Sequence, residues 1–196
     1  MINNILFLGP STSPLLKWLQ HNENNLLWTE NKITASFIVK HNIDFVISYG
    51  YRHIIVREIL DLLPNRIINL HISLLPFNRG ADPNFWSFID NTPKGVSIHY
   101  VDEGIDTGKL LVQKEVVFDS KHITFSSTYN KLKRVIEDLF YKNWADIKAL
   151  RVKAWEQNKG GTYHRSKDKL GYMYLLKDRG WDTKISTVIN KINGNE

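Results

Sequence analysis

The chain has 196 residues, of which 42% are hydrophobic and 12% aromatic, so it can bury the core of one folded domain and is not a disordered chain. It contains no cysteine, which excludes disulfides and thiolate metal sites and suits a reducing cytoplasm. No apolar run approaches the roughly 18–20 residues of a membrane span. A net charge of +6 and a pI of about 9.4 favour an anionic partner, either a nucleic acid or an acidic small molecule.

The first 71 residues alternate between short apolar runs and amphipathic segments, a pattern typical of βαβ units with a parallel sheet. Strands are predicted at residues 2–8, 26–29, 44–48 and 66–71. Helices are predicted from Pro14 onward, at 35–40 and at 57–63, where Pro64 stops the last one. The N-terminal segment is predicted to be a strand and not a signal peptide, because it lacks the basic start and the long apolar run of a signal peptide.

After residue 71 the pattern changes. Residues 95–101 and 110–117 alternate as strands, and residues 126–150 have the period of an amphipathic helix. The tail from Trp155 is polar, basic and aromatic, and we expect it to wrap around the domain. The sequence therefore predicts an α/β domain over residues 1–150 and a C-terminal extension over residues 151–196 that packs on the same domain.

Two polar residues stand where a predicted buried strand ends. Asn69 and His71 are two positions apart, so their side chains would point to one face of the strand. In open α/β sheets, ligands gather at the carboxyl ends of the strands. An amide and an imidazole on one face can hold a carbonyl oxygen that gains negative charge, and the imidazole can also move a proton.

A second polar segment, Asp102 to Gly108, follows the next predicted strand. Its glycines allow a tight loop, and its Asp106 lies 35 residues after His71. A carboxylate beside a histidine fixes the tautomer of the ring and favours the imidazolium. Taken alone, each residue also fits a structural role, as a backbone-bonded Asn, a core His or a turn Asp.

These segments resemble the formyltransferase superfamily, which includes phosphoribosylglycinamide, methionyl-tRNA and bacterial sugar N-formyltransferases. The resemblance rests on HNIDFVISYGYRHII, INLHISLLPFNRGADP, KGVSIHYVDEGIDTG and the following Gln113. It implies a Rossmann-like fold with a mostly parallel sheet, a C-terminal helix and a tail, and it implies that Asn69, His71 and Asp106 are catalytic. It also implies N10-formyltetrahydrofolate as the formyl donor. The chain departs from the family in an abbreviated N-terminal half, which has fewer elements before Tyr49.

Ten residues match the positions that hold the folate in that family. They are Tyr49, Gly50, Tyr51, Arg52, His53, Val101, Asp102, Glu103, Gly104 and Ile105. A planar pterin needs backbone donors and acceptors in a mostly apolar slot, and loops that contain glycine can supply them.

The amine that receives the formyl group is indicated by two further stretches, FNRGADPNFWSFIDNTPKGVSIHY and GGTYHRSKDK with RGWDT near the end. Both resemble sugar-nucleotide N-formyltransferases of surface polysaccharide and lipopolysaccharide O-antigen biosynthesis. The acceptor would then be a nucleotide-linked amino-deoxy sugar. Candidate contacts to it are Ser11, Thr12, Ser13, Arg79, Trp86 and Tyr163. Helix capping, a structural ion pair and core packing are the competing roles of these residues.

The sequence is also compatible with other functions. Phosphoribosylglycinamide formyltransferase is the main alternative enzyme, and a non-catalytic binder of nucleotides or nucleic acid is the alternative from another class. A methionyl-tRNA formyltransferase is not expected, because only 83 residues follow Gln113. We expect no metal, no membrane contact and no nucleic acid partner, and we consider a homodimer because the last third of the chain is rich in aromatic residues.

Overall fold

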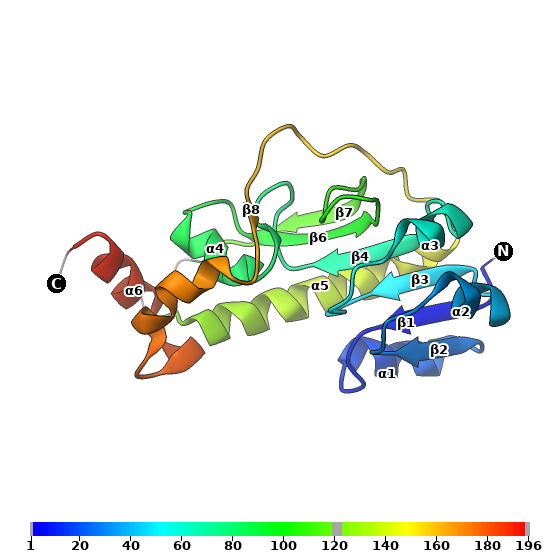
Figure 1. Ribbon diagram of the computed structural model, residues 1–196, viewed down its shortest axis with the longest axis horizontal. Coiled ribbons are helices and arrows are strands. Elements are labelled where there is room, and N and C mark those ends of the chain that lie inside the picture. The colour runs from blue at the N-terminus through cyan, green and yellow to red at the C-terminus, as the bar shows by residue number, and fades with distance from the viewer. Residues whose placement is uncertain (1, 119–122, 195–196) are drawn as a thin grey trace. The chain divides into compact units, whose positions relative to one another are not determined.

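The computed structural model describes residues 2–118 and 123–194. Its main sheet has the strand order β2-β1-β3-β4-β6-β7, and its first four strands pair in parallel (Figure 1). The strands of the sheet are β1 (Ile5–Leu8), β2 (Leu26–Thr29), β3 (Phe45–Ser48), β4 (Ile67–His71), β6 (Gly95–Tyr100) and β7 (Leu110–Glu115). The predicted α/β class with a mostly parallel sheet is therefore confirmed.

Contacts divide the chain into two compact units. The first unit contains the chain up to His71, Ile98–Val112 and Phe140–Gln157. The second contains Ile72–Ser97, Gln113–Leu139 and the chain from Asn158 onward. The division predicted at residue 150 stays a prediction, since these units are built from interleaved segments.

One face of the sheet in the first unit is covered by two short helices, α2 (Ala35–Lys40) and α3 (Arg57–Leu62). The strands present alternate apolar side chains to these helices, as the period of a strand requires. The buried cluster on this face contains Leu6, Leu8, Ile33, Ile38, Ile43, Val46, Ile55, Ile59, Leu63 and Ile67. Burying one such side chain stabilises the fold by about 1.5–3 kcal/mol, so this cluster fixes the register of β1, β3 and β4.

The opposite set of strand residues packs with α1 (Pro14–Asn22) and with the last part of α5 (Phe125–Lys148). Phe45 of β3 meets Trp144 edge-on at 5.8 Å between ring centroids, and Trp18 meets Phe140 at 6.1 Å. The indole of Trp144 also donates a 2.6 Å hydrogen bond to the carboxylate of Glu23, which pairs with Lys148 as well. Phe140 and Trp144 of this helix therefore belong to the core of the first unit.

The second unit has a core of its own. Phe85 and Trp86 of α4 (Pro83–Ile89) pack with Phe125 and with Leu175, Leu176, Ile185 and Val188 of the tail. Two short strands, β5 (Arg79–Gly80) and β8 (Tyr163–His164), pair in parallel. The tail continues through 3-10 turns at Asp168–Leu176 and Gly180–Asp182 to α6 (Ile185–Ile192).

The longer predicted elements are all present, within three residues at each end. The first strand begins at Ile5 and not at residue 2, and β7 ends at Glu115. The sequence did not predict α4, β5, β8 or the ordered turns of the tail. None of the helices in the described part of the chain is long and apolar enough to cross a membrane.

Candidate active site

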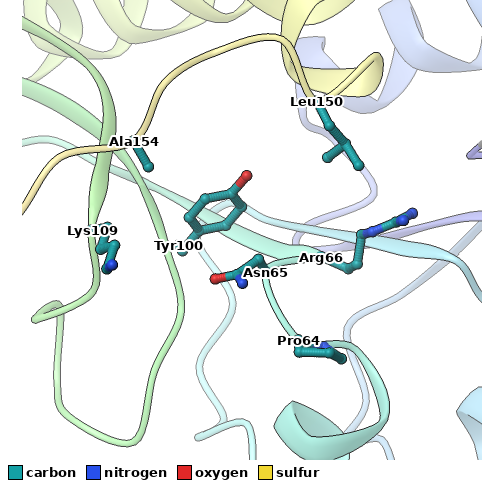
Figure 2. A pocket seen from close by; sticks show the side chains of 7 residues that line it. All are labelled: Pro64, Asn65, Arg66, Tyr100, Lys109, Leu150 and Ala154. Carbon is teal, nitrogen blue, oxygen red and sulfur yellow. The ribbon is translucent and has the colours of Figure 1, made fainter.

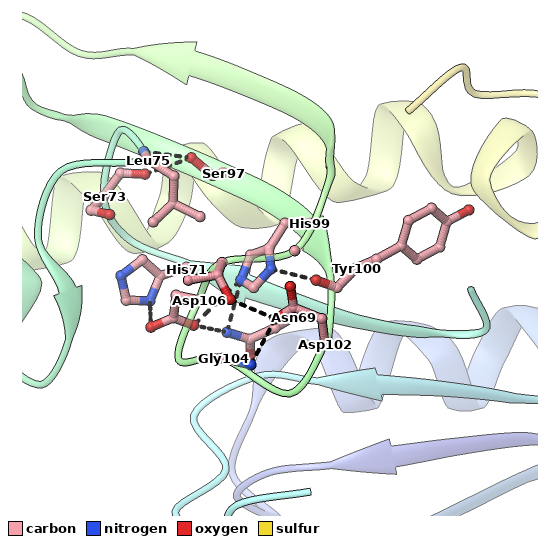
Figure 3. A network of polar contacts seen from close by, with 12 residues as sticks. Asn69, His71, Ser73, Leu75, Ser97, His99, Tyr100, Asp102, Gly104 and Asp106 are labelled. Atoms are coloured by element: carbon pink, nitrogen blue, oxygen red, sulfur yellow. Dashed lines mark hydrogen bonds and ion pairs between the residues drawn. The ribbon is translucent and has the colours of Figure 1, made fainter. Parts of the chain in front are cut away.

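Asn69 and His71 lie at the carboxyl end of β4, as the sequence predicted. Asn69 is in register with Ser48 of β3, so the preceding strands of the sheet place its amide. His71 is 7% exposed and Asn69 is half-buried. Both belong to the first unit, and their side chains point to the same face of the strand (Figure 3).

Asp106 reaches these two side chains from the loop between β6 and β7. Its Oδ1 accepts a 3.1 Å hydrogen bond from the amide of Asn69, and its Oδ2 lies 3.6 Å from Nδ1 of His71. The carboxylate is 13% exposed, so water screens these contacts weakly. The three residues that the sequence proposed as catalytic therefore converge within one unit.

The backbone of Asp106 is in the left-handed region, with φ of 53°. This conformation is uncommon for residues other than glycine, although aspartate tolerates it better than most. The turn is closed by Asp102, whose Oδ1 accepts hydrogen bonds from the backbone N–H of Gly104 at 3.1 Å and the hydroxyl of Thr107 at 2.6 Å. A side chain at Gly108 would meet the carbonyl of Tyr100 at 1.9 Å, so only glycine fits at the base of the loop.

His99 is a fourth member of the site that the sequence reasoning missed. It is 1% exposed, and its Nε2 lies 3.4 Å from both Nδ2 of Asn69 and Oδ1 of Asp106. Its Nδ1 lies 2.7 Å from the backbone carbonyl of Tyr100. Because a carbonyl only accepts hydrogen bonds, this contact places a proton on Nδ1. The imidazole therefore has a fixed tautomer beside the carboxylate and the amide.

This arrangement can stabilise and move charge. Asp106 holds the Nδ1 side of the His71 ring, so Nε2 of the same ring faces away from the carboxylate. That nitrogen is suited to exchange a proton with a reacting group. The amide of Asn69 is a neutral donor that Asp106 orients, which suits it to a carbonyl oxygen that becomes negative.

The segment predicted to hold the folate follows β3. A side chain at Gly9 would meet the carbonyl of Tyr49 at 2.2 Å, so only glycine fits where the chain after β1 passes the end of β3. Within the described chain, the backbone groups of residues 50–55 make no hydrogen bond to other backbone groups. These donors and acceptors, together with those of the loop after β6, fit the needs of a planar heterocycle.

Tyr51 anchors the start of that segment. Its hydroxyl donates to the carbonyl of Asn31 at 2.9 Å and accepts from the N–H of Ile33 at 3.2 Å. Burial raises the pKa of Tyr51, and the hydrogen bond from Ile33 lowers that pKa by a smaller amount. On the neighbouring loop, Glu103 forms an exposed ion pair with Arg57 at 3.2 Å.

The turn at Ser11–Ser13 is less suited to an anion than the sequence suggested. The N–H of Ser11 donates a 2.7 Å hydrogen bond to the carboxylate of Glu30. A phosphate at this position would have to displace that negative charge. Ser13 is 4% exposed and its side chain does not cap α1, while Ser11 and Thr12 are exposed.

The other three nucleotide-sugar candidates lie in the second unit. Trp86 is 3% exposed, and His164 stacks on its ring with 3.7 Å between centroids. His164 is held by Asp90 at 2.7 Å. This packing argues against the stacking of Trp86 on a substrate ring, because His164 already covers one of its faces. Arg79 is half-buried on β5, and Tyr163 beside it is 45% exposed.

A separate pocket of about 410 Å³ lies at the amino end of β4, away from the carboxyl end that carries Asn69 and His71 (Figure 2). It is lined by Pro64, Asn65, Arg66, Tyr100, Lys109, Leu150 and Ala154. Burial raises the pKa of Tyr100, and the nearby positive charge of Arg66 lowers it by a smaller amount. None of the predicted site residues lines this pocket.

The described residues contain no group of three His, Asp or Glu side chains that could hold a metal ion. His53 lies on the predicted folate segment and meets Tyr51 edge-on at 5.2 Å between ring centroids, while His71 and His99 belong to the polar cluster.

Comparison with known proteins matches residues 19–142 to the Formyl transferase family. A solved structure, the formyltransferase PseJ from Anoxybacillus kamchatkensis, is 45% identical, has a TM-score of 0.89, and covers 94% of this chain and 97% of its own. That protein was crystallised with UDP-4,6-dideoxy-4-formamido-L-AltNAc and tetrahydrofolate. A 4-N formyltransferase from Francisella tularensis has the same fold, with 21% identity, a TM-score of 0.74 and coverage of 89% and 79%.

Among curated sequences, the methionyl-tRNA formyltransferase of Syntrophus aciditrophicus is 32% identical over 155 residues. The match covers 77% of this chain and 47% of that protein. The chain thus spans about half the length of the curated relatives that it matches.

Proposed function

Because the chain belongs to the formyl transferase family, we propose that it transfers a formyl group from N10-formyltetrahydrofolate to the amine of a nucleotide-linked amino-deoxy sugar. The observation that carries the proposal is the convergence of Asn69, His71 and Asp106 around one point at the carboxyl end of β4. An amide, an imidazole and a carboxylate in this order supply the donor, the proton carrier and the orienting charge of an acyl transfer.

The acceptor class follows from the resemblance to PseJ over nearly the whole of both chains. The two molecules in the PseJ complex are a UDP-linked sugar with a formylated amine at C4 and a folate without its formyl group. They are the product pair of a transfer to that amine. We therefore take a UDP-linked 4-amino-4,6-dideoxy sugar as the first acceptor to test.

The residues of this chain perform the transfer in defined roles. N10-formyltetrahydrofolate supplies an activated carbonyl carbon, held by the backbone groups of residues 49–53 and 101–105. Asn69 and His71 donate to the carbonyl oxygen as it becomes negative, and loss of one such donor slows catalysis by roughly 10²–10³. Asp106 orients His71 and helps to move the proton of the attacking amine towards the leaving nitrogen. The nucleophile belongs to the substrate, so no covalent enzyme intermediate forms.

The decisive experiment is a panel of acceptors. The protein is incubated with N10-formyltetrahydrofolate and one amine at a time, either UDP-linked 4-amino sugars, dTDP-linked 3-amino sugars or glycinamide ribonucleotide. Release of tetrahydrofolate is followed, and the products are identified by mass. Formylation of a nucleotide sugar supports the proposal, whereas turnover with glycinamide ribonucleotide alone contradicts it.

His71→Ala provides the matched control for that panel. The variant should bind tetrahydrofolate in a calorimetric titration and yet fail to transfer the formyl group, because the folate is held mainly by backbone groups. Loss of folate binding together with activity would instead place His71 in the folate site.

The location and assembly of the protein belong to the same proposal. The absence of cysteine supports a reducing cytoplasm. The exposed apolar side chains of the tail, Leu170 at 69% and Tyr174 at 64%, support a homodimer, which sedimentation at micromolar concentration would detect.

A further inference from the structure

The loop that carries Asp106 is held by a residue 51 positions further along the chain. Nε2 of Gln157 donates one hydrogen bond to the carbonyl of Asp106 at 2.9 Å and another to the carbonyl of Gly108 at 2.8 Å. One primary amide thus uses both of its hydrogens on the backbone of the loop. All three residues belong to the first unit.

The two residues before Gln157 hold the same loop. Trp155 and Leu110 exchange both backbone hydrogen bonds, at 2.8 and 3.0 Å, in an isolated antiparallel bridge. Glu156 forms an ion pair with Lys109 at 3.0 Å, although both side chains are more than half exposed. The backbone bridge is the stronger of these contacts, because an exposed ion pair contributes little. It sets the position from which Gln157 reaches the loop.

The orientation of the Gln157 amide is dictated by the loop. Two carbonyl acceptors require a donor between them, so the nitrogen has to face Asp106 and Gly108. Oε1 of Gln157 is buried and accepts no hydrogen bond from the described residues. The side chain therefore gains its polar contacts from the two carbonyls.

The contact acts on a residue whose backbone conformation is uncommon. Asp106 has a φ of 53°, and the hydrogen bond from Gln157 restrains the peptide group that follows it. The direction of this peptide sets the direction of the Asp106 side chain, which meets Asn69 and His71. A shift of about 1 Å at such a group is enough to slow catalysis strongly.

We propose that Gln157 is a positioning residue, supplied by the segment that follows α5, which holds Asp106 in the conformation needed for formyl transfer. The inference rests on the proposed function, because it assigns Gln157 a part in the same reaction. The segment after α5 thus helps to position the active site, in addition to the packing that the sequence predicted for the tail.

Gln157→Met tests this role, since methionine has a similar length and donates no hydrogen bond. We expect kcat to fall roughly 10- to 100-fold, the loss associated with one or two net hydrogen bonds, with KM for both substrates within about twofold of wild type. Gln20→Met is the matched control, because it makes the same change at an exposed position of α1 and should leave kcat unaltered.

Two further measurements separate positioning from general stability. If Gln157 acts through Asp106, Gln157→Met should have little additional effect in an Asp106→Asn background, whereas a purely structural role predicts independent, additive losses. Gln157→Glu is the second variant, in case the methionine variant does not fold. Its turnover relative to wild type should rise as the pH falls, because only the protonated carboxyl group has a hydrogen to donate, and it can restore one of the two hydrogen bonds.

The outcomes are distinguishable. Wild-type protein that transfers formyl to none of the amines in the panel overturns the proposed function, and the positioning role of Gln157 with it. Active wild-type protein together with an unaltered kcat in Gln157→Met, or additive losses in the double variant, overturns the role of Gln157 alone.

Discussion

Asp106 is the residue on which the chemistry of the site depends most. It touches Asn69, His71 and His99 at once, from a backbone conformation that few residue types adopt. Asparagine has the same size and tolerates the same φ, so Asp106→Asn removes the negative charge and little else.

We expect Asp106→Asn to lower turnover by about 10²–10⁴ while the free energy of unfolding changes by less than about 1 kcal/mol. Rates of tetrahydrofolate release and urea denaturation measure the two effects. Near-normal turnover in a folded variant would remove Asp106 from the mechanism.

Substitution of His99 is expected to lower the turnover number by a smaller factor. Its ring contributes a fixed tautomer beside Asp106, and the change His99→Phe replaces the imidazole by an apolar aromatic ring without either nitrogen. The carbonyl of Tyr100 then loses its donor. A lost buried partner costs about 1–3 kcal/mol, which corresponds to roughly 5- to 150-fold if the whole loss falls on the transition state.

Steady-state kinetics should therefore show a lower kcat for His99→Phe, with a smaller effect than that of Asp106→Asn. Calorimetry should show an unchanged affinity for tetrahydrofolate. A loss of folate affinity at constant kcat would place His99 in the binding of the folate instead.

At the scale of elements, the sequence predicted those strands and helices that have a periodic pattern of apolar residues. Buried strands such as β1 and β3 consist almost entirely of consecutive apolar residues, and α5 repeats apolar residues every three or four positions. The short elements α4, β5 and β8 have no such pattern. They form because tertiary contacts complete them, as when the backbone of Arg79 bonds to Thr162 at 3.0 Å.

The candidate site was predictable to the same extent. Asn69 and His71 share one strand, so their spacing alone places them together. His99 lies on β6, and its approach to Asn69 depends on which strands pair and in which register, which a single sequence does not reveal. Gln157 has no local signal at all, because its two partners are 49 and 51 residues away.

The segment after β3 gives a prediction at this scale, because Tyr51 fastens it to the chain before α2. Tyr51→Phe leaves the N–H of Ile33 and the carbonyl of Asn31 without this partner. We expect the free energy of unfolding to fall by about 0.5–1.5 kcal/mol near neutral pH, as measured by urea denaturation. Tyr174→Phe, at an exposed position, should change it little.

The pH dependence of the same variant has a definite sign. Burial raises the pKa of Tyr51 above the ordinary value of 10.0, so the unfolded chain loses this proton first. The stability that Tyr51 contributes is therefore present below pH 10 and declines as the pH rises through 10 towards the pKa of the folded state. Between pH 10 and the pKa of the folded state, wild-type protein should lose more stability than Tyr51→Phe. Equal losses would contradict the role assigned to the hydroxyl group of Tyr51.

At the scale of the whole molecule, the net charge of +6 separates two kinds of partner. A protein that binds nucleic acid through its charge releases counterions, so its affinity falls steeply as salt rises. A protein that binds a folate and a nucleotide sugar makes few ion pairs with each ligand and binds it mainly through shape complementarity. Its affinity should change much less over the same range of salt.

We therefore expect no retention on immobilised DNA or RNA at about 0.15 M salt, whereas tetrahydrofolate still binds at that ionic strength. Because the ligand binds only the folded chain, tetrahydrofolate at about 100 times its dissociation constant should stabilise the protein by roughly 2.7 kcal/mol. Thermal unfolding with and without the ligand measures this shift, and tetrahydrobiopterin, which lacks the aminobenzoyl-glutamate part, serves as the control. Strong retention on nucleic acid with no stabilisation by tetrahydrofolate would contradict the enzymatic assignment. The positive charge of the chain would then bind a nucleic acid, and the protein would not bind the formyl donor that the residues around Asp106 require.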